Sequence, residues 1–294
     1  MMIKLGIIGF SKGNGHPYSF SAIINGYNKT YFQKVGYPQI LNYLEKQKKN
    51  NFFIKDLKIT HAWSQDFKKT KLLCKACKIE NPLKNINDMI GNVDGVIIAR
   101  DDWQSHKKLA SIFLEKKIPV FVDKPLTLSI EELNYFKKFA KQKLLMSCSA
   151  LRFSNELKNV KSKIKKEKSI KLIIANVVND VEKYAVHMLE VVSALNILNV
   201  KKITNLNGFY KSFHIELKSN KSLILNCFGK SFSIFNFQLY LSNRKLEINF
   251  EDNFSSFKNT LIEFKKLIRN KKMNYSFNET SNIIKTLIVL KKLK

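Results

Sequence analysis

The spacing of apolar residues divides the chain into two parts with different patterns. In the first part, short runs of β-branched residues alternate with segments in which apolar residues recur every three or four positions. Residues 93–125 show this most clearly, with a β-branched run at 96–98, helical spacing over 109–113 and a second apolar run at 119–122. A strand, a helix and a strand in about thirty residues indicate a βαβ unit, in which the two strands are parallel.

The other elements of the first part follow the same pattern. We expect strands at 2–9, 58–63 and 144–149. We expect one helix that begins near residue 17, and three further helices at 37–47, 72–79 and 128–142. This alternation of strands and helices predicts a parallel, Rossmann-like sheet that ends near residue 150.

After residue 150 the alternation gives way to consecutive strands. A strand at 170–178 and a helix at 182–198 precede expected strands at 201–209, 211–218, 222–228, 231–241 and 245–250. Phe235, Phe237 and Leu239 alternate with polar residues, as in a half-buried antiparallel strand, so we expect a meander with one polar face. Two helices end the chain, and we expect them to pack back onto the first domain.

These patterns predict an α/β fold with two domains. Residues 1–150 are expected to form a Rossmann-like, dinucleotide-binding domain around a parallel sheet. Residues 151–294 are expected to form an α+β domain with an open, mostly antiparallel sheet, used for substrate binding and oligomerisation. Because large apolar side chains on an open sheet face rarely stay exposed, we expect a homodimer or homotetramer formed through this C-terminal sheet.

The formal net charge of +29 raises the question of nucleic-acid binding. Nucleic-acid sites favour arginine, because its planar guanidinium pairs with phosphates and guanine edges. The chain contains only four arginines, and its lysines are dispersed over nearly every predicted helix. We therefore expect no nucleic-acid partner and interpret the charge as attraction for an anionic, phosphate-bearing substrate.

The first residues of the chain and the length of its apolar runs are informative about localisation. The first residues, MMIKLGIIGF, run directly into a strand without a cleavage site, and no apolar run approaches the roughly 18 residues that span a bilayer. These features predict a cytoplasmic protein without a membrane partner.

Cys74 and Cys77 form a CxxC motif within a lysine-rich predicted helix. A structural zinc site would need a second pair of ligands at suitable spacing, and the sequence has no second CxxC. A redox role is the alternative, but we interpret the two cysteines as small side chains on one helix face, and we expect no metal.

A glycine-rich loop follows the first predicted strand and precedes a helix. Free backbone N–H groups and the helix dipole both favour an anion at such a position, which is typical of a phosphate-binding loop. The dinucleotide pattern G-x-G-x-x-G is not met, since Ser11 and Asn14 replace the second and third glycines. The alternative is an ordinary surface loop, but its place in the chain favours cofactor binding. The candidate cofactor-binding residues in it are Gly9, Ser11, Gly13, Asn14, Gly15 and His16.

The end of the second predicted strand bears on the choice of cofactor. An Asp or Glu there would bind the ribose hydroxyls of NAD. Here the neutral Ser64 leaves room for a 2′-phosphate, and Lys68 and Lys69 follow closely. We therefore expect NAD or NADP as the cofactor, with Ser64 among the residues that contact it.

Several short motifs follow one another along the chain in a distinctive order. The first strand and glycine loop are followed by VDGVIIAR and His106, by VDKPL, by ALRF and by a helix with an HxxE motif. In this order the whole chain resembles the glucose–fructose oxidoreductase and inositol dehydrogenase (Gfo/Idh/MocA) family of nicotinamide-dependent sugar oxidoreductases. The segment IPVFVDKPLTLSIEEL is similar to the family's E-K-P segment, with Asp123 in place of Glu.

The resemblance implies roles for individual residues. Lys124 matches the family's active-site lysine, and His106 matches the histidine in the helix after the fourth strand. His187 matches the histidine that members use in substrate binding or proton transfer. Asp123 and Lys124 of the E-K-P-like segment, with Arg100 at the end of VDGVIIAR, join the candidate cofactor-binding residues.

Chemistry supports the same assignments. Oxidation of an alcohol requires loss of the hydroxyl proton as hydride leaves, and a histidine can accept that proton near neutral pH. A lysine beside the oxygen can stabilise its developing negative charge. We therefore predict Lys124 and His187 as catalytic residues. The competing interpretations are a satisfied core histidine at His187 and a His106 that only supports the strand-four loop.

Three further residues are candidates for substrate binding. Glu190 lies one helical turn from His187, so its carboxylate could orient the imidazole. Lys183 shares that face, where many family members have an aspartate, and would favour a substrate with a carboxylate or phosphate group. The third candidate is Arg152 of the ALRF segment.

Together these observations predict an NAD(P)-dependent oxidoreductase that transfers hydride to or from a sugar or sugar derivative, in surface-carbohydrate metabolism. The first alternative is a family member that binds cofactor without turnover, which the irregular glycine loop and Lys183 would allow. The second is a basic nucleic-acid-binding protein, which would show a steep salt dependence of affinity.

Overall fold

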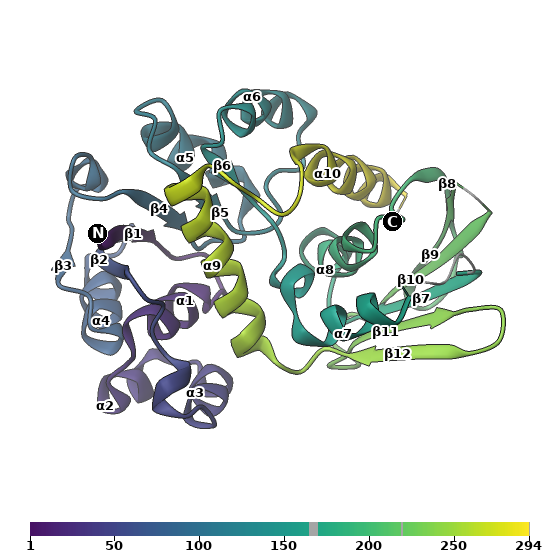
Figure 1. Cartoon of the computed structure of the whole chain (residues 1–294), viewed down its shortest axis with the longest axis horizontal. Coiled ribbons are helices and arrows are strands. Elements are labelled where there is room, and N and C mark those ends of the chain that lie inside the picture. Colours follow the sequence, from purple (N-terminus) through teal and green to yellow (C-terminus); the bar gives the residue numbers. More distant parts are fainter. Residues whose placement is uncertain (165–169, 219, 294) are drawn as a thin grey trace. The chain divides into compact units, whose positions relative to one another are not determined.

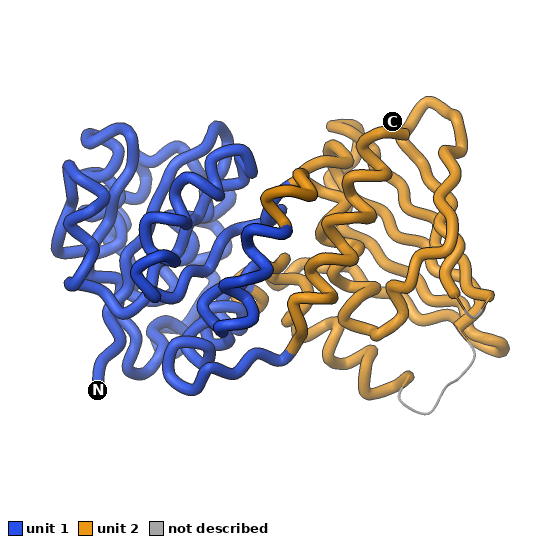
Figure 2. The backbone as a smooth tube through the Cα atoms, turned by 90° about the horizontal axis from the view of Figure 1, so that it is seen from above, with its two compact units in different colours: residues 1–127, 134–147, 257–274 blue, residues 128–133, 148–256, 275–294 orange. Residues whose placement is uncertain are grey.

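The computed structural model describes residues 1–164, 170–218 and 220–293 (Figure 1). The chain divides into two compact units (Figure 2). Unit 1 comprises residues 1–127, 134–147 and 257–274, and unit 2 comprises residues 128–133, 148–256 and 275–294. Of the two final helices, α9 (Asn253–Asn270) lies in unit 1 except for its first turn, and α10 (Phe277–Lys292) lies in unit 2.

Unit 1 is built around a parallel sheet. Its strands, within the described residues, are β1 (Ile3–Ile8), β2 (Leu57–Trp63), β3 (Asn81–Pro82), β4 (Gly95–Ile98), β5 (Val120–Val122) and β6 (Leu145–Met146). Their order across the sheet is β3-β2-β1-β4-β5-β6, and every neighbouring pair is parallel. This order is that of a doubly wound dinucleotide-binding sheet, and it confirms the predicted Rossmann-like fold. The strand expected at 144–149 is shorter than predicted.

The helices of unit 1 connect these strands. They are α1 (His16–Asn25), α2 (Lys29–Phe32), α3 (Pro38–Glu45), α4 (Phe67–Cys77) and α5 (His106–Leu114), and α6 (Ile130–Lys141) spans the boundary between the units. From β1 the chain moves to β2 on one side, whereas from β4 it moves to β5 in the opposite direction. Because such crossovers are right-handed, the helices α1 and α5 cover opposite faces of the sheet.

An aromatic core joins α1, α9 and the sheet of unit 1. Phe121 of β5 lies with its ring centroid 5.9 Å from that of Phe20 on α1 and 5.9 Å from that of Phe264 on α9. The rings of Phe20 and Phe257 meet edge to face at 5.2 Å. Each such pair adds about 1 kcal/mol beyond the burial of apolar area, so α9 is firmly held in unit 1 although it follows the second sheet in sequence.

Unit 2 contains a mixed, mostly antiparallel sheet. Its strands are β7 (Leu172–Val177), β8 (Val200–Asn205), β9 (Lys211–Leu217), β10 (Lys221–Cys227), β11 (Phe235–Tyr240) and β12 (Lys245–Asn249). Their order is β12-β11-β7-β10-β9-β8, and the only parallel pair among these described strands is β7 with β10. The predicted open, mostly antiparallel sheet is therefore confirmed.

The predicted meander is wrong at one point. The consecutive strands β10 and β11 are not neighbours, because β7 lies between them and pairs with both. Alternation of apolar and polar residues identifies the face of each strand but not its neighbours. The sequence therefore predicted the strands correctly and their order incorrectly.

The inner face of this sheet packs against helix α8 (Val181–Ala194), which in turn packs against α10. Ile173, Ala175 and Val177 of β7 are fully buried on this face. The remaining helix of the unit, α7 (Asn155–Ile164), packs near β12. Within the described part of the chain, no helix combines the length and the apolar character required to cross a membrane.

The outer face of the second sheet carries polar as well as apolar side chains. A row of asparagines crosses four neighbouring strands, with Asn226 Nδ2 donating to Asn176 Oδ1 at 2.8 Å, Asn176 Nδ2 to Asn236 Oδ1 at 3.2 Å and Asn236 Nδ2 to Asn249 Oδ1 at 2.8 Å. These amides satisfy one another, so they do not require a partner. The homodimer or homotetramer stays a prediction.

Candidate active site

The predicted cofactor-binding residues lie at one edge of the parallel sheet. Ile8 of β1 pairs in register with Trp63 of β2 and with Ile98 of β4, and Ile98 pairs with Val122 of β5. The segments that follow these four strands therefore start side by side at their carboxyl ends, where open α/β sheets bind ligands.

The loop after β1, residues 9–16, depends on two of its glycines. Gly13 has a φ of +78°, which side chains disfavour. A Cβ at Gly15 would overlap the end of the Ile40 side chain on α3 and approach the ring of Tyr37, so a larger residue would force these side chains to shift. None of the hydrogen bonds among the described residues uses the backbone N–H groups of Lys12, Gly13 or Gly15. These donors can therefore bind an anion, as a phosphate-binding loop requires.

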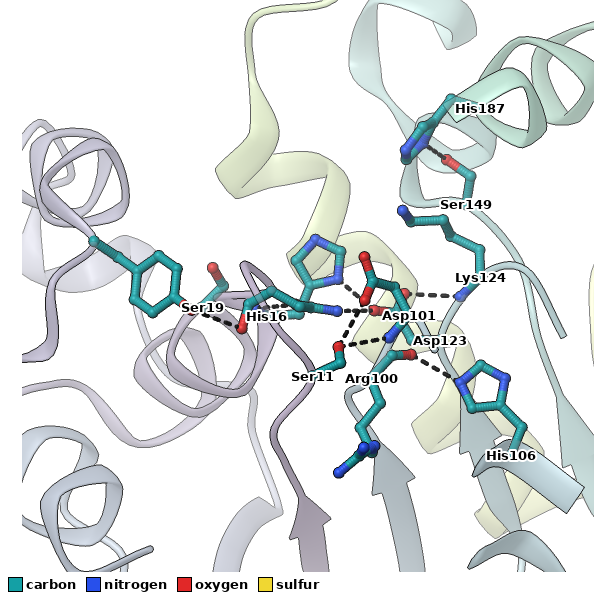
Figure 3. Close-up of polar contacts among 12 residues, drawn as sticks. Ser11, His16, Ser19, Arg100, Asp101, His106, Asp123, Lys124, Ser149 and His187 are labelled. Atoms are coloured by element: carbon teal, nitrogen blue, oxygen red, sulfur yellow. Dashed lines mark hydrogen bonds and ion pairs between the residues drawn. The ribbon is translucent and has the colours of Figure 1, made fainter. Parts of the chain in front are cut away.

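A polar cluster connects this loop to the segments after β4 and β5 (Figure 3). Ser11 Oγ donates to Asp101 Oδ1 at 2.6 Å, and Asn14 Nδ2 donates to Asp123 Oδ2 at 3.2 Å. His16 Nδ1 lies 2.5 Å from the same Asp123 oxygen. The structure thus brings together four residues that the sequence nominated separately, and it adds Asp101, which the sequence analysis missed although it directly follows Arg100.

Asp123 is ionised in this cluster although it is only 2% exposed. Burial by itself would raise the pKa of its carboxyl group, but His16, Lys124 and the backbone N–H of Lys124 together lower that pKa to about 2. The N–H of Lys124 donates to Asp123 Oδ1 at 2.9 Å. Lys124 is itself buried, with 5% exposure, which is rare for a lysine. A fixed negative charge therefore adjoins the predicted catalytic lysine.

The segment after β2 forms a helix cap. Ser64 is buried, and its Oγ donates to the carbonyl oxygen of Asp66 at 2.8 Å. The Asp66 carboxylate accepts the N–H groups of Lys68 and Lys69 at 2.9 and 3.1 Å, as an N-cap of α4. The only carboxylate in this segment is thus used by the helix terminus, and the contact of Ser64 with a cofactor stays a prediction.

Arg100 connects the ends of β4 and β2. Its guanidinium donates to both carboxylate oxygens of Asp102, at 2.8 and 2.6 Å, and to Gln65 Oε1 at 2.8 Å. This bidentate pair fixes the guanidinium beside the candidate cofactor edge. Whether Arg100 contacts the cofactor stays a prediction.

His106 is a support for the strand-four loop. It is fully buried at the start of α5, with Nδ1 3.0 Å from the carbonyl oxygen of Leu126 and Nε2 2.9 Å from that of Arg100. Because both ring nitrogens are occupied by backbone carbonyls, the structure favours the supporting role over a role in proton transfer.

The candidate residues of unit 2 centre on His187 of α8. Its Nδ1 lies 2.7 Å from Ser149 Oγ (Figure 3), and its ring packs against those of Tyr184 and Phe235. Ser149 Oγ also accepts the N–H of Leu151 at 3.3 Å, in the 3-10 helix that follows. No motif or spacing in the sequence indicated Ser149, which lies 38 residues from its partner.

The predicted pairing of Glu190 with His187 differs from the observed one. The Glu190 carboxylate accepts Arg152 Nε at 2.6 Å and the N–H of Ser149 at 3.2 Å. Burial raises the pKa of Glu190 even though Arg152 opposes that shift. A carboxylate buried in this way requires a cation, and Arg152 supplies it while also donating to Glu279 at 2.8 Å. Glu190 and Arg152 therefore form a buried structural ion pair, and their contact with a substrate stays a prediction.

Lys183 lies in the first turn of α8. Its backbone N–H donates to the N-cap residue Asp180 at 2.8 Å. It precedes His187 by one helical turn, as predicted, and its role in substrate binding stays a prediction.

The two cysteines of the CxxC motif are buried thiols on α4. Burial raises the pKa of Cys74 to about 12 and that of Cys77 well above its usual value. This agrees with the interpretation as small apolar side chains. Across residues 1–164, 170–218 and 220–293, no cluster of three or more His, Cys, Asp or Glu side chains is arranged to hold a metal ion.

The strand order, the glycine-containing loop and the polar carboxyl edge define a dinucleotide-binding domain. Residues 26–149 match a family described as an oxidoreductase family with an NAD-binding Rossmann fold. This match agrees with the predicted resemblance to the Gfo/Idh/MocA oxidoreductases, and it confirms the expected nicotinamide cofactor. None of the curated proteins matches the chain in sequence.

Solved structures resemble the whole chain in fold. The scyllo-inositol dehydrogenase of Lactobacillus casei, with bound NAD(H) and scyllo-inositol, is 14% identical with a TM-score of 0.77, covering 100% of this chain and 97% of the other. The myo-inositol 2-dehydrogenase of Lactobacillus plantarum is 12% identical with a TM-score of 0.78 and the same coverage. The UDP-N-acetylglucosamine 3-dehydrogenase of Acidithiobacillus ferrooxidans is 9% identical with a TM-score of 0.74, covering 100% and 98%.

Proposed function

We propose that the protein transfers hydride between a nicotinamide dinucleotide and a hydroxyl-bearing carbon of a cyclic polyol or sugar derivative. The main support is the match of residues 26–149 to an NAD-binding oxidoreductase family, combined with the cluster of Ser11, Asp101, Asp123 and Lys124 at the carboxyl edge of the parallel sheet. Similar folds occur in dehydrogenases named for inositols and for a nucleotide sugar, which supports the substrate class.

The residues of unit 1 fit the cofactor. The N–H groups of Lys12, Gly13 and Gly15 would bind the pyrophosphate at the start of α1. When bound, the nicotinamide ring accepts or returns the hydride. The remaining chemistry is the movement of the hydroxyl proton, and side chains of the protein must carry it out.

Lys124 and His187 are the proposed groups for that proton. Lys124 follows β5, and the ionised Asp123 beside it keeps a negative charge next to the lysine. In our proposal Lys124 stabilises the negative charge that develops on the substrate oxygen. His187 is the proposed base, since an imidazole can accept a proton near neutral pH and Ser149 Oγ at 2.7 Å from Nδ1 orients the ring.

The test is hydride transfer by the purified protein, followed by the near-ultraviolet absorbance of the reduced nicotinamide. The panel should contain inositol isomers and UDP-linked hexosamines, each with NAD⁺ and NADP⁺, and the corresponding ketones in the reverse direction. Turnover of a UDP-linked sugar would favour the proposed place in surface-carbohydrate metabolism.

Variants Lys124→Met and His187→Gln should each lower kcat by about 10²- to 10⁴-fold, and His187→Gln should change cofactor affinity little. His214→Gln is the matched control, because His214 lies in β9 with Nε2 on Ser222 Oγ. If Lys124→Met turns over at the rate of the parent protein, the catalytic assignment is wrong. Cofactor binding without turnover of any substrate would support the family member that has lost activity.

A further inference from the structure

A cavity of about 560 Å³ lies within unit 1, between the carboxyl ends of β1 and β2. The loop after β1, the segment after β2 and the start of α4 line it together with the residues before α3. Among the described residues that line it, Lys12, Lys34 and Lys69 are basic and none is acidic. In a dinucleotide-binding sheet, this region takes the ribose of the adenosine.

The segment after β2 places no carboxylate among the described residues that line the cavity. A ribose with free 2′- and 3′-hydroxyls is usually held by a carboxylate at this strand end. Here Asp66 caps α4, since its Oδ1 accepts the N–H groups of Lys68 and Lys69, and it does not line the cavity. Ser64 is buried with its hydroxyl on Asp66 and Thr70.

The side chain that does line the cavity from this segment is Gln65. Its Nε2 donates to the carbonyl oxygen of Phe10 at 2.7 Å, and its Oε1 accepts from Arg100 at 2.8 Å. A neutral amide held in this way neither repels a phosphate nor replaces the missing carboxylate. A dianionic group in the cavity would lie near three lysines, and none of the described residues that line the cavity is acidic.

We propose that this cavity binds the 2′-phosphate-bearing adenosine of NADP(H), and that Lys12, Lys34 and Lys69 make the chain selective for NADP(H) over NAD(H). This inference rests on the proposed function, because it assigns the cofactor of the same site. It goes beyond that function because the family is described only as NAD-binding.

The test is direct binding of NADPH and NADH to the full-length protein, measured by isothermal titration calorimetry. NADPH should bind about tenfold or more tightly than NADH, and rising salt should weaken NADPH binding more than NADH binding. The fragments 2′,5′-ADP and 5′-ADP repeat the comparison without the nicotinamide half, so they report on this cavity alone.

Lysine variants locate the selectivity. Lys12→Gln, Lys34→Gln and Lys69→Gln should each weaken NADPH and 2′,5′-ADP binding by about three- to tenfold while changing NADH binding less than about twofold. Lys71→Gln is the matched control: it removes the same charge from α4, but Lys71 does not line the cavity and lies over the ring of Phe67. All four lysines are exposed, so the variants should fold.

The outcomes separate the two proposals. Tight NADH binding with equal or weaker NADPH binding overturns the selectivity and leaves the proposed function intact. An equal loss in Lys69→Gln and Lys71→Gln also overturns it, because the effect would then come from net charge. Failure to bind either dinucleotide overturns the proposed function, and this inference with it.

Discussion

Asp123 offers a quantitative test of the polar cluster at the carboxyl edge of unit 1. Its pKa falls from 3.8 to about 2 because His16 and Lys124 outweigh the effect of burial. Each unit of difference between folded and unfolded pKa contributes about 1.4 kcal/mol, so the ionised carboxylate stabilises the folded state by about 2 kcal/mol. Asp123→Asn retains the shape of the side chain and removes its charge. The variant should therefore be less stable by about this amount near pH 6.

The sign of the pH dependence follows from the direction of the shift. The folded pKa is depressed, so the unfolded chain binds the proton more readily at low pH. The stabilisation is complete above about pH 5 and disappears as the pH falls from about 4 to about 2. The difference in stability between the parent protein and Asp123→Asn should shrink over the same interval.

Urea unfolding followed by tryptophan fluorescence measures this difference in stability for unit 1. Both tryptophans, Trp63 and Trp103, belong to unit 1, so the signal does not report on unit 2. Asp88→Asn, at an exposed carboxylate of unit 1, is the control and should change stability by less than about 0.5 kcal/mol. A difference that stays constant between pH 6 and pH 3, or an Asp123→Asn variant as stable as the parent, would refute the reasoning.

Further predictions concern unit 2 and the cysteines. Ser149→Ala removes the hydroxyl on His187 Nδ1, so kcat should fall about two- to tenfold and the pH profile of kcat should move; an unchanged profile would exclude a positioning role. Arg152→Met leaves Glu190 buried without its cation, and thermal unfolding should show a loss of about 3–5 kcal/mol; a loss below about 1 kcal/mol would contradict this. Burial raises the pKa of Cys74 to about 12, so iodoacetamide should label this thiol only after unfolding, as read by mass spectrometry; rapid labelling of the folded protein would contradict this.

Sequence patterns were sufficient to predict the parallel sheet and the residues at its carboxyl edge. The β-branched run at 96–98 and the run at 119–122 each marked a buried strand, and a strand end fixes where the next residues lie. Asp123 and Lys124 could therefore be placed at the carboxyl edge from the sequence alone. The glycine loop could be placed by the same argument, even though its glycine spacing is irregular.

Side-chain partners at long sequence separation could not be predicted in this way. His16 meets Asp123 across 107 residues, and Arg152 reaches Glu190 across 38. Helical spacing nominated Glu190 as the partner of His187, but a buried carboxylate pairs first with a cation. The spacing rule contains no information on which cation the fold brings near.

The order of the strands in unit 2 could not be predicted from the sequence, for a related reason. Alternating burial in β10 and β11 shows which residues face the core, and it is the same whether the two strands are neighbours or are separated by β7. Likewise, apolar spacing marked α9 as amphipathic without showing that Phe264 packs on Phe121.

The most direct test of a dinucleotide at the carboxyl edge of unit 1 is amide hydrogen exchange with and without saturating NADPH or NADH. We predict slower exchange in residues 9–16 and around Lys124, with β8 and β9 of unit 2 unchanged as an internal reference. Unchanged exchange in residues 9–16 with both dinucleotides, or protection confined to unit 2, would contradict the proposed site.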